Sequence, residues 1–211
     1  MIIIFDLDGT LINTIDDLGQ ACNHALQACG FPIHEIADYP QLVGNGINRL
    51  IERALPVENR NETTVSRMRE YFVPYYDAHN CDLTRPYDGI PELLLSLKKA
   101  GHTMAVASNK YQTATEKIVN HFFPNTFDIV LGERENVPRK PNPQIVWDIL
   151  SNLTEQSDII YIGDSLVDAE TAKAADATLV LCTWGFCTEE QLKTANPNYM
   201  INHPSELLNI V

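Results

Sequence analysis

The chain has few basic residues and no long apolar run, and both deficits limit what it can bind. Of its 211 residues, 15 are Lys or Arg and 28 are Asp or Glu, which gives a formal net charge of −13 at pH 7. So acidic a chain repels the phosphate backbone of nucleic acid and anionic lipid surfaces. Its apolar runs fall short of the roughly 18 residues that a membrane span needs. We therefore expect no nucleic-acid partner and no membrane partner.

Cysteine is also sparse, and its pattern indicates a reducing compartment. The five cysteines are an odd number, and no two of them have C-x-x-C spacing. A chain of this length without a secretory signal is expected to keep its cysteines as free thiols. The apolar start Ile2–Phe5 is interrupted by Asp6 and Asp8 and follows no basic residues, so it does not have the pattern of a signal peptide. We expect a cytoplasmic protein.

What the chain does have is an alternation of short apolar runs and amphipathic stretches, which is typical of α/β proteins. Ile2–Phe5 is a continuous run of β-branched and aromatic residues, as expected of a parallel strand that is buried on both faces. The pattern predicts one parallel sheet flanked by helices. Further strands are expected at Met104–Ala107, Phe127–Leu131, Ile159–Ile162, Thr178–Leu181 and Tyr199–Ile201, and helices at Tyr111–His121, Pro143–Asn152, Asp168–Ala175, Glu189–Ala195 and Ser205–Ile210.

Residues 15–84 do not follow this alternation. Three stretches with helical character, Ile15–Cys29, Leu42–Leu55 and Thr63–His79, follow one another without a convincing strand between them. Thr14 is the expected N-cap of the first helix. We predict an all-helical domain at 15–84 that is inserted into an α/β core domain made of residues 1–14 and 85–211.

Polar residues follow four of the expected strands, at the sheet edge where parallel sheets bind their ligands. Each group taken alone has a structural alternative as turn residues or as a helix cap. Together they bring four carboxylates, one cation and two small hydrogen-bonding side chains to one edge. They are Asp6 and Asp8 after the first strand, Ser108 and Asn109 after the second, Lys140 downstream of the third, and Asp164 and Asp168 after the fourth.

Carboxylates crowded at one edge repel each other, so a positive group must lie among them. Mg²⁺ prefers oxygen ligands of this kind, and Lys140 adds a second positive charge suited to a phosphoryl oxygen. With its charge screened, Asp6 could attack phosphorus as a nucleophile. Asp8 could protonate the leaving oxygen and later deprotonate a water molecule.

These groups resemble the four ordered motifs of the haloacid dehalogenase superfamily. The resemblance implies a Rossmann-like parallel sheet core flanked by helices, with an all-helical cap domain of the C1 type inserted between the first and second motifs. The motifs are Asp6-Leu7-Asp8-Gly9-Thr10-Leu11, Ser108-Asn109-Lys110, Lys140-Pro141 and Gly163-Asp164-Ser165-x-x-Asp168.

The resemblance also implies a role for each of these residues. Asp6 would be the nucleophile and Asp8 the general acid and base. Asp6, the main-chain carbonyl of Asp8, and Asp164 would hold Mg²⁺, with Asp168 in support. The founding dehalogenases lack the second aspartate, so Asp8 places the chain with the phosphotransferases. Ser108, Asn109 and Lys140 would bind the phosphoryl group, Asn109 through its main-chain N–H.

A finer resemblance is to the phosphoglycolate phosphatase subgroup. It rests on Val43-Gly44-Asn45-Gly46, Tyr87-Asp88-Gly89 and Thr183-Trp184-Gly185-Phe186, although Ser108 and Arg139 depart from the subgroup's commoner residues. Gly44, Asn45 and Arg49 are the cap residues that could contact the substrate. The alternative is a plain turn at Gly44 and Asn45 and a solvated helix face at Arg49.

The expected function is that of a Mg²⁺-dependent phosphatase, a hydrolase that cleaves a small phosphate monoester through an aspartyl-phosphate intermediate. The first substrate to consider is 2-phosphoglycolate. A sugar-phosphate phosphatase, a nucleotidase and a phosphomutase are alternatives on the same core. A non-catalytic phospho-acceptor switch is a further alternative, although it would need neither Asp8 nor the helical insert. The expected partner is a small anionic phosphate ester, and both a monomer and a homodimer remain open.

Overall fold

The computed structural model describes residues 1–153 and 157–211, which form two compact units. The larger unit, called the core unit here, comprises Met1–Asn13 and Pro86–Val211. The smaller, the helical unit, comprises Thr14–Arg85. Each unit buries its own set of apolar side chains. Among the described residues, no helix combines the length and the apolar character that crossing a membrane requires.

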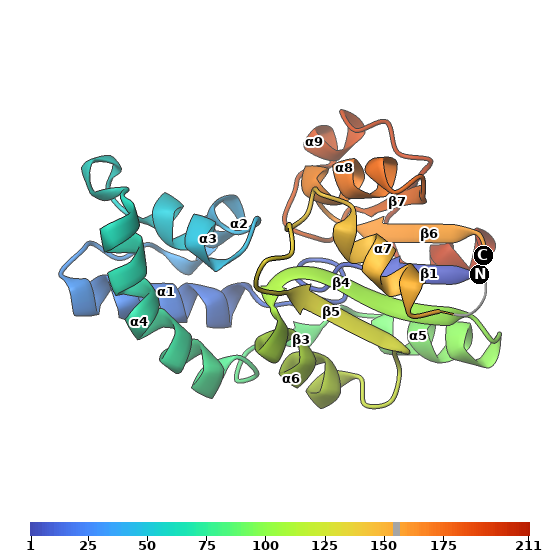
Figure 1. Ribbon diagram of the computed structural model, residues 1–211, viewed down its shortest axis with the longest axis horizontal. Helices are drawn as coiled ribbons and strands as arrows, with labels where there is room; N and C mark the ends of the chain where they lie inside the picture. The colour runs from blue at the N-terminus through green and yellow to red at the C-terminus, as the bar shows by residue number, and fades with distance from the viewer. Residues whose placement is uncertain (154–156) are drawn as a thin grey trace. The chain divides into compact units, whose positions relative to one another are not determined.

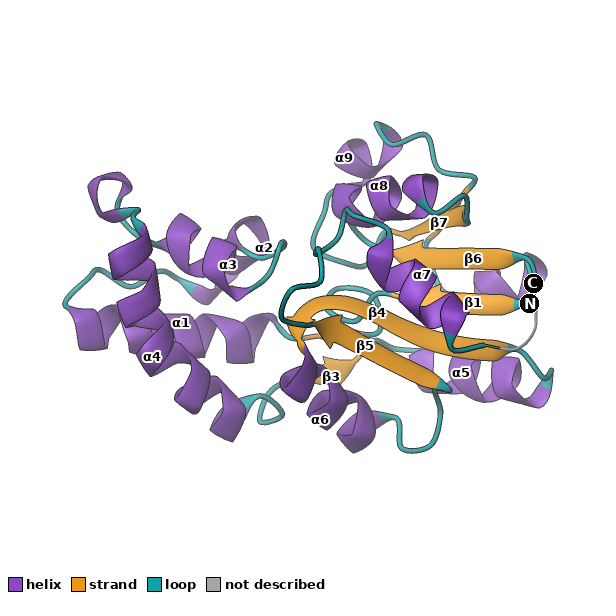
Figure 2. Ribbon diagram, viewed as in Figure 1, coloured by secondary structure: helices purple, strands orange, loops and turns teal. Residues whose placement is uncertain are grey.

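The core unit is built on a parallel sheet, which has six strands within the described residues (Figure 2). The strand order is β5-β4-β1-β6-β7-β8, and every neighbouring pair is parallel. The first strand of the chain therefore lies inside the sheet, between two strands that come much later in the sequence. The strands are β1 (Ile2–Phe5), β4 (Thr103–Tyr111), β5 (Ile129–Glu133), β6 (Ile159–Gly163), β7 (Thr178–Cys182) and β8 (Tyr199–Ile201).

Helices cover both faces of this sheet, with α7 and α5 on opposite sides (Figure 1). Side chains alternate between the two faces of a strand, and Ile2 and Ile4 of β1 share one cluster with Ile145 and Ile149 of α7. Burial on both faces explains why β1 is apolar throughout. The helices are α5 (Ile90–Lys99), α6 (Gln112–Phe122), α7 (Gln144–Ser151), α8 (Leu166–Ala174), α9 (Glu189–Lys193) and the 3₁₀ helix η3 (Pro204–Asn209).

The helical unit is centred on the packing of its two long helices, α1 and α4. Asp17 of α1 is buried, and its carboxylate accepts hydrogen bonds from the main-chain N–H groups of Leu83 (3.0 Å) and Thr84 (2.8 Å) and from the Thr84 hydroxyl (2.7 Å). The unit contains α1 (Ile15–Cys29), η1 (Ile36–Asp38), α2 (Tyr39–Leu42), α3 (Ile47–Ala54), η2 (Val57–Asn59) and α4 (Glu62–His79), and the short strands β2 (Ile12–Asn13) and β3 (Arg85–Pro86) pair with each other.

Several elements differ from the sequence-based expectations. The helix expected at Leu42–Leu55 is interrupted, because Gly44, Asn45 and Gly46 have φ values of 104°, 64° and 80°, which an α-helix does not contain. Thr14 is the N-cap residue of α1, but its side chain makes no capping hydrogen bond. The helix α5 was not expected, although Gly89 at its N-cap and a proline in its first turn are start signals.

Candidate active site

Three of the predicted acidic residues meet at the carboxyl edge of the sheet. Asp6 follows β1 and Asp164 follows β6, and these strands are neighbours in the sheet. Asp168 lies in the first turn of α8. Each of the three side chains offers an oxygen atom within 4.8 Å of the others, and all three are largely buried. The strand order thus brings together residues that are about 160 positions apart in the sequence.

Lys140 places its ammonium group among these carboxylates. Its Nζ lies 2.9 Å from Asp6 Oδ1 and 2.8 Å from Asp168 Oδ1, and it also contacts the Ala107 carbonyl oxygen (2.9 Å) and the Tyr161 hydroxyl (3.0 Å). Only 2% of the Lys140 side chain is exposed. Burial alone would lower the pKa of Lys140, but the charges of Asp168 and Asp6 raise it well above its ordinary value. The ammonium is therefore a permanent charge at the centre of the site.

The carboxylates nonetheless outnumber this cation. Burial, followed by the charge of Asp168, raises the pKa of Asp6 to about 7, against a smaller lowering effect of Lys140. Burial and the charges of Asp168 and Asp6 also raise the pKa of Asp164 well above its ordinary value. When all three carboxylates are ionised, they and the one ammonium carry two net negative charges, on the hard oxygen donors that Mg²⁺ prefers. The donor set and its excess charge therefore fit a divalent cation.

The three carboxylates differ in the hydrogen bonds that their oxygen atoms make. Asp168 uses Oδ1 for Lys140 and Oδ2 for the Ser165 hydroxyl at 2.5 Å. Asp164 accepts a hydrogen bond from the main-chain N–H of Phe186 at 2.7 Å, and the Thr10 hydroxyl lies 3.2 Å from its other oxygen. Asp168 is thus committed to orienting Lys140. The carboxylate oxygens of Asp6 and Asp164 are the better candidates for a cation.

Two glycines allow the loops to approach Asp164 closely. Gly9 has φ of +86°, and a Cβ there would lie 2.3 Å from Asp164 Oδ2. A Cβ at Gly185 would lie 2.3 Å from the Cβ of Asp164. Real Cβ atoms do not approach other atoms this closely, so any larger residue would displace the carboxylate. The sequence analysis quoted Gly185 only as part of a motif and did not identify this contact.

Asp8 lies two residues beyond Asp6 in a turn, where the main-chain N–H groups of Leu11 and Ile12 both donate to the Leu7 carbonyl oxygen. Its Oδ1 is 3.1 Å from Nζ of Lys110, and the two side chains are 16% and 4% exposed. The sequence analysis did not assign a role to Lys110. The only signal was its position as the third residue of the Ser108-Asn109-Lys110 motif.

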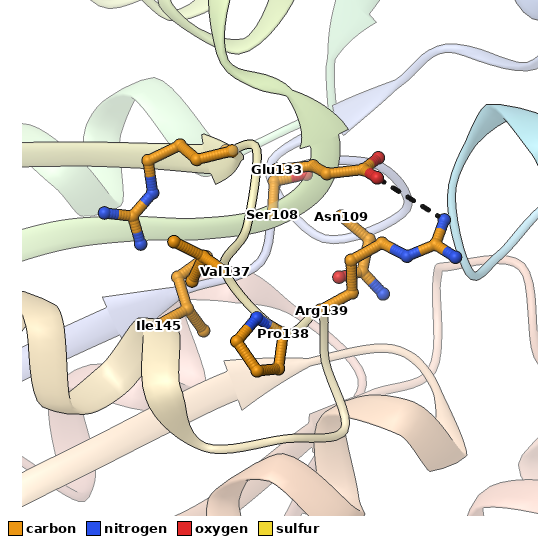
Figure 3. Close-up of a pocket in the computed structure, with 9 residues that line it drawn as sticks. Ser108, Asn109, Glu133, Val137, Pro138, Arg139 and Ile145 are labelled. Carbon is orange, nitrogen blue, oxygen red and sulfur yellow. Dashed lines mark ion pairs between the residues drawn. The ribbon is translucent and has the colours of Figure 1, made fainter.

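Ser108 and Asn109 lie in the distal part of β4 and line a small pocket beside Glu133 and Arg139 (Figure 3). Ser108 is buried, and its hydroxyl accepts a hydrogen bond from the main-chain N–H of Lys110. The Asn109 side chain bridges the main chain of Lys140, accepting from its N–H at 2.9 Å and donating to its carbonyl oxygen at 3.1 Å. Asn109 therefore helps to hold Lys140 in place.

The predicted cap residues Gly44, Asn45 and Arg49 belong to the helical unit. Gly44 and Asn45 lie in the loop before α3, where Arg53 donates to the carbonyl oxygens of Val43 (2.9 Å) and Gly44 (3.3 Å). Arg49 is largely exposed and pairs with Glu52 at 2.5 Å. These contacts support the loop's conformation.

The motifs and the fold can be compared with known proteins. The model of the family described as haloacid dehalogenase-like hydrolase matches residues 3–182. The chain belongs to this family of hydrolases. A protein named phosphoglycolate phosphatase from Vibrio parahaemolyticus is 33% identical to this hydrolase over 100% of this chain and 95% of that one. Another of that name from Mesorhizobium japonicum is 30% identical over 96% and 90%.

The fold of the hydrolase is also similar to solved structures. A protein from Lactobacillus delbrueckii subsp. bulgaricus matches it with a TM-score of 0.91 at 30% identity, covering 97% of this chain and 95% of that chain. Family membership confirms the expected α/β fold class and the expectation that the chain is an enzyme.

Proposed function

We propose that this hydrolase is a Mg²⁺-dependent phosphatase that cleaves 2-phosphoglycolate to glycolate and phosphate through a phosphorylated Asp6. Its family and the relatives named phosphoglycolate phosphatase along its whole length support a phosphoric monoester hydrolase. The observation that carries the proposal is the contact of the Asp6 carboxylate with the buried Lys140 ammonium beside two further buried carboxylates.

In this proposal the cation would be held by Asp6, Asp164 and the main-chain carbonyl of Asp8. Asp168 is left to Lys140 and Ser165, with which it is already hydrogen bonded. When bound, the cation would screen the nucleophile and neutralise charge on the phosphoryl oxygens.

The first half of the reaction transfers the phosphoryl group to Asp6. A carboxylate oxygen of Asp6 forms a bond to phosphorus while the bond between phosphorus and the ester oxygen breaks. Asp8 gives its proton to that oxygen, and glycolate leaves as the alcohol. Lys140 and Ser108, with the main-chain N–H groups of Leu7 and Asn109, stabilise the charge on the transferring oxygens.

The second half of the reaction hydrolyses the phosphorylated Asp6, and Asp8 now acts as a base. Asp8, now ionised, takes a proton from a water molecule, whose oxygen attacks phosphorus and displaces the Asp6 carboxylate. Phosphate is released, and Asp6 is ionised again. A residue that first donates and then accepts a proton must lie close to the nucleophile, and Asp8 is two residues from Asp6 in the same turn.

A panel of phosphate esters tests the proposed substrate. We expect kcat/KM to be highest for 2-phosphoglycolate among 2-phosphoglycolate, hexose phosphates, nucleoside monophosphates and pyrophosphate. A hexose phosphate or a nucleotide with a higher value would replace 2-phosphoglycolate as the substrate. Uptake of one phosphate per chain without turnover would instead identify a phospho-acceptor switch.

A further inference from the structure

We propose that Lys110 binds the carboxylate of the leaving group, and that it thereby selects phosphate monoesters of 2-hydroxy carboxylic acids. This inference rests on the proposed function, because it assigns a specificity residue to that same site. It concerns a different end of the substrate from the phosphoryl group, which Lys140 and Ser108 would bind.

The position of Lys110 beside Asp8 is the first observation. Its Nζ lies 3.1 Å from Asp8 Oδ1. In the proposed reaction, Asp8 donates a proton to the ester oxygen, so the two groups must come within hydrogen-bond distance. In the ester of a 2-hydroxy acid, the carboxylate is bonded to the carbon that carries this oxygen, which places it roughly 3 Å away by standard bond lengths. The ammonium next to Asp8 is therefore within reach of the substrate's carboxylate.

The second observation is that the main chain of Lys110 is held firmly. Its N–H donates to the Ser108 hydroxyl at 3.1 Å, and its carbonyl oxygen accepts from the Thr115 hydroxyl at 3.0 Å. Gly132 of β5 packs so closely that a Cβ there would lie 2.5 Å from the Lys110 carbonyl oxygen. A fixed main chain limits where the ammonium can lie, which is a requirement for discriminating between substrates.

The third observation is that the site contains two buried lysines, which pair with different aspartates. Lys110 and Lys140 are the buried lysines among the described residues, and each pairs with a different aspartate of the Asp6-Leu7-Asp8 motif. Lys140 is bound to Asp6, Asp168, a carbonyl oxygen and a hydroxyl. Lys110 therefore supplies a second buried ammonium, beside the residue that would protonate the leaving group.

A purely structural role for Lys110 predicts a different result. If Lys110 only orients Asp8, its loss slows esters without a carboxylate at least as much as esters with one, because their more basic leaving oxygen depends at least as strongly on the proton from Asp8. If it binds the leaving group, its loss slows esters with a carboxylate more than esters without one. The ratio of two kcat/KM values from one enzyme preparation separates these roles, and it does not depend on how much of the preparation is folded.

The experiment uses the full chain with Mg²⁺ and compares 2-phosphoglycolate with ethyl phosphate, which lacks the carboxylate, and with the phosphate ester of 3-hydroxypropanoate, whose carboxylate is one carbon further away. We expect the unmodified enzyme to prefer 2-phosphoglycolate over both. Lys110→Met should lower its preference over ethyl phosphate by roughly tenfold or more, the value of one charge-assisted hydrogen bond. Lys110→Arg should retain part of the preference.

The matched control is Lys173→Met, which makes the same change in net charge at an exposed position of α8. Its preference should equal that of the unmodified enzyme. An unchanged or increased ratio in Lys110→Met would overturn the inference and leave the proposed function intact. Equal use of the 3-hydroxypropanoate ester would overturn the stated substrate class. A lack of preference in the unmodified enzyme would instead contradict the proposed function itself.

Discussion

The pKa of Asp6 is set by effects of opposite sign: burial and the charge of Asp168 raise it, and the charge of Lys140 lowers it. A buried carboxylate is costly, and Asp168 beside it adds repulsion, so the pKa of Asp6 rises to about 7 although Lys140 is in contact. The ionised form of Asp6 is therefore destabilised when no further cation is present. This is the state in which a divalent cation and a phosphoryl group gain the most by binding.

Replacing Asp6 with Asn tests its role as the nucleophile. The amide has nearly the same shape and can still accept a hydrogen bond from Lys140, but it cannot form the phosphorylated intermediate. We expect kcat for 2-phosphoglycolate to fall by at least roughly 1,000-fold. The far-ultraviolet circular dichroism spectrum should stay unchanged. A variant that keeps substantial activity would exclude Asp6 as the nucleophile.

The raised pKa of Asp6 also predicts how Mg²⁺ binding depends on pH. Below pH 7 the Asp6 carboxyl is protonated in the metal-free protein, and the cation must displace that proton. Asp164, the other proposed carboxylate ligand, also has a raised pKa, so the affinity for Mg²⁺ should fall by at least about tenfold per pH unit below pH 7. Titration calorimetry between pH 5.5 and 8.5 measures this. An affinity that is constant over that range would show that no such proton is displaced.

Because Gly185 packs closely against Asp164, we expect that adding one methyl group at this position lowers the activity. In Gly185→Ala the new Cβ would meet the Asp164 side chain at 2.3 Å, so the carboxylate must move away from its place beside Asp6. We expect kcat/KM to fall by about 10–100-fold, as for other residues that orient a metal ligand. The control is Gly101→Ala, whose Cβ meets nothing within 4 Å. It should cost about 1–2 kcal/mol of stability through its positive φ and leave kcat/KM unchanged.

At the scale of elements, Asp17 shows how a buried charge holds α1 to the segment before β3. Its carboxylate is the acceptor for the main-chain N–H groups of Leu83 and Thr84 and for the Thr84 hydroxyl. In Asp17→Ala these donors lose their acceptor in a buried environment. We expect the free energy of unfolding of the helical unit to fall by about 1–3 kcal/mol, measured by urea denaturation. Asp16→Ala, the exposed neighbour, should cost only a few tenths of a kcal/mol.

The sequence predicted a helix or strand well where the hydrophobic pattern alone determined the local structure. The range Ile2–Phe5 was predicted as a strand with its observed bounds, because a short apolar run between polar residues allows few alternatives. The helix predicted at Leu42–Leu55 was confirmed for Ile47–Ala54 and wrong before it, since its apolar spacing continues through Gly44-Asn45-Gly46, where φ is positive. Hydrophobic spacing cannot detect such a break, and the two glycines should have outweighed it.

The candidate site was predictable to the extent that its residues follow strands. Asp6, Asp164 and Lys140 could be named because parallel strands end at a common edge, and the structure brings them together. The pairing of Lys110 with Asp8 could not be named. It depends on β4 continuing to Tyr111, beyond the apolar run that ended the predicted strand at Ala107. A strand that continues into polar residues leaves no periodic signal in the sequence.

At the scale of the whole molecule, the two units have separate cores. The helical unit buries Leu26 of α1 with Met68 and Phe72 of α4, and the core unit buries the residues of β1. In Leu26→Ala we expect a loss of about 2–5 kcal/mol. Amide hydrogen exchange should become faster across residues 14–85 and stay slow in β1 and β6, as expected when cores open separately. Equally accelerated exchange in both units would show that they unfold together.

The place of β1 inside the sheet has a consequence for synthesis on the ribosome. The partners of β1 are β4 and β6, and the second of these is complete only when Gly163 has been added. At a synthesis rate of ~5–20 residues per second, roughly 10–30 s pass between the synthesis of β1 and that of both neighbouring strands. The helical unit is continuous in sequence and can form during that interval. The nascent chain thus carries an unpaired hydrophobic strand that a chaperone can bind, and Asp6 is translated long before the residues that surround it in the folded protein.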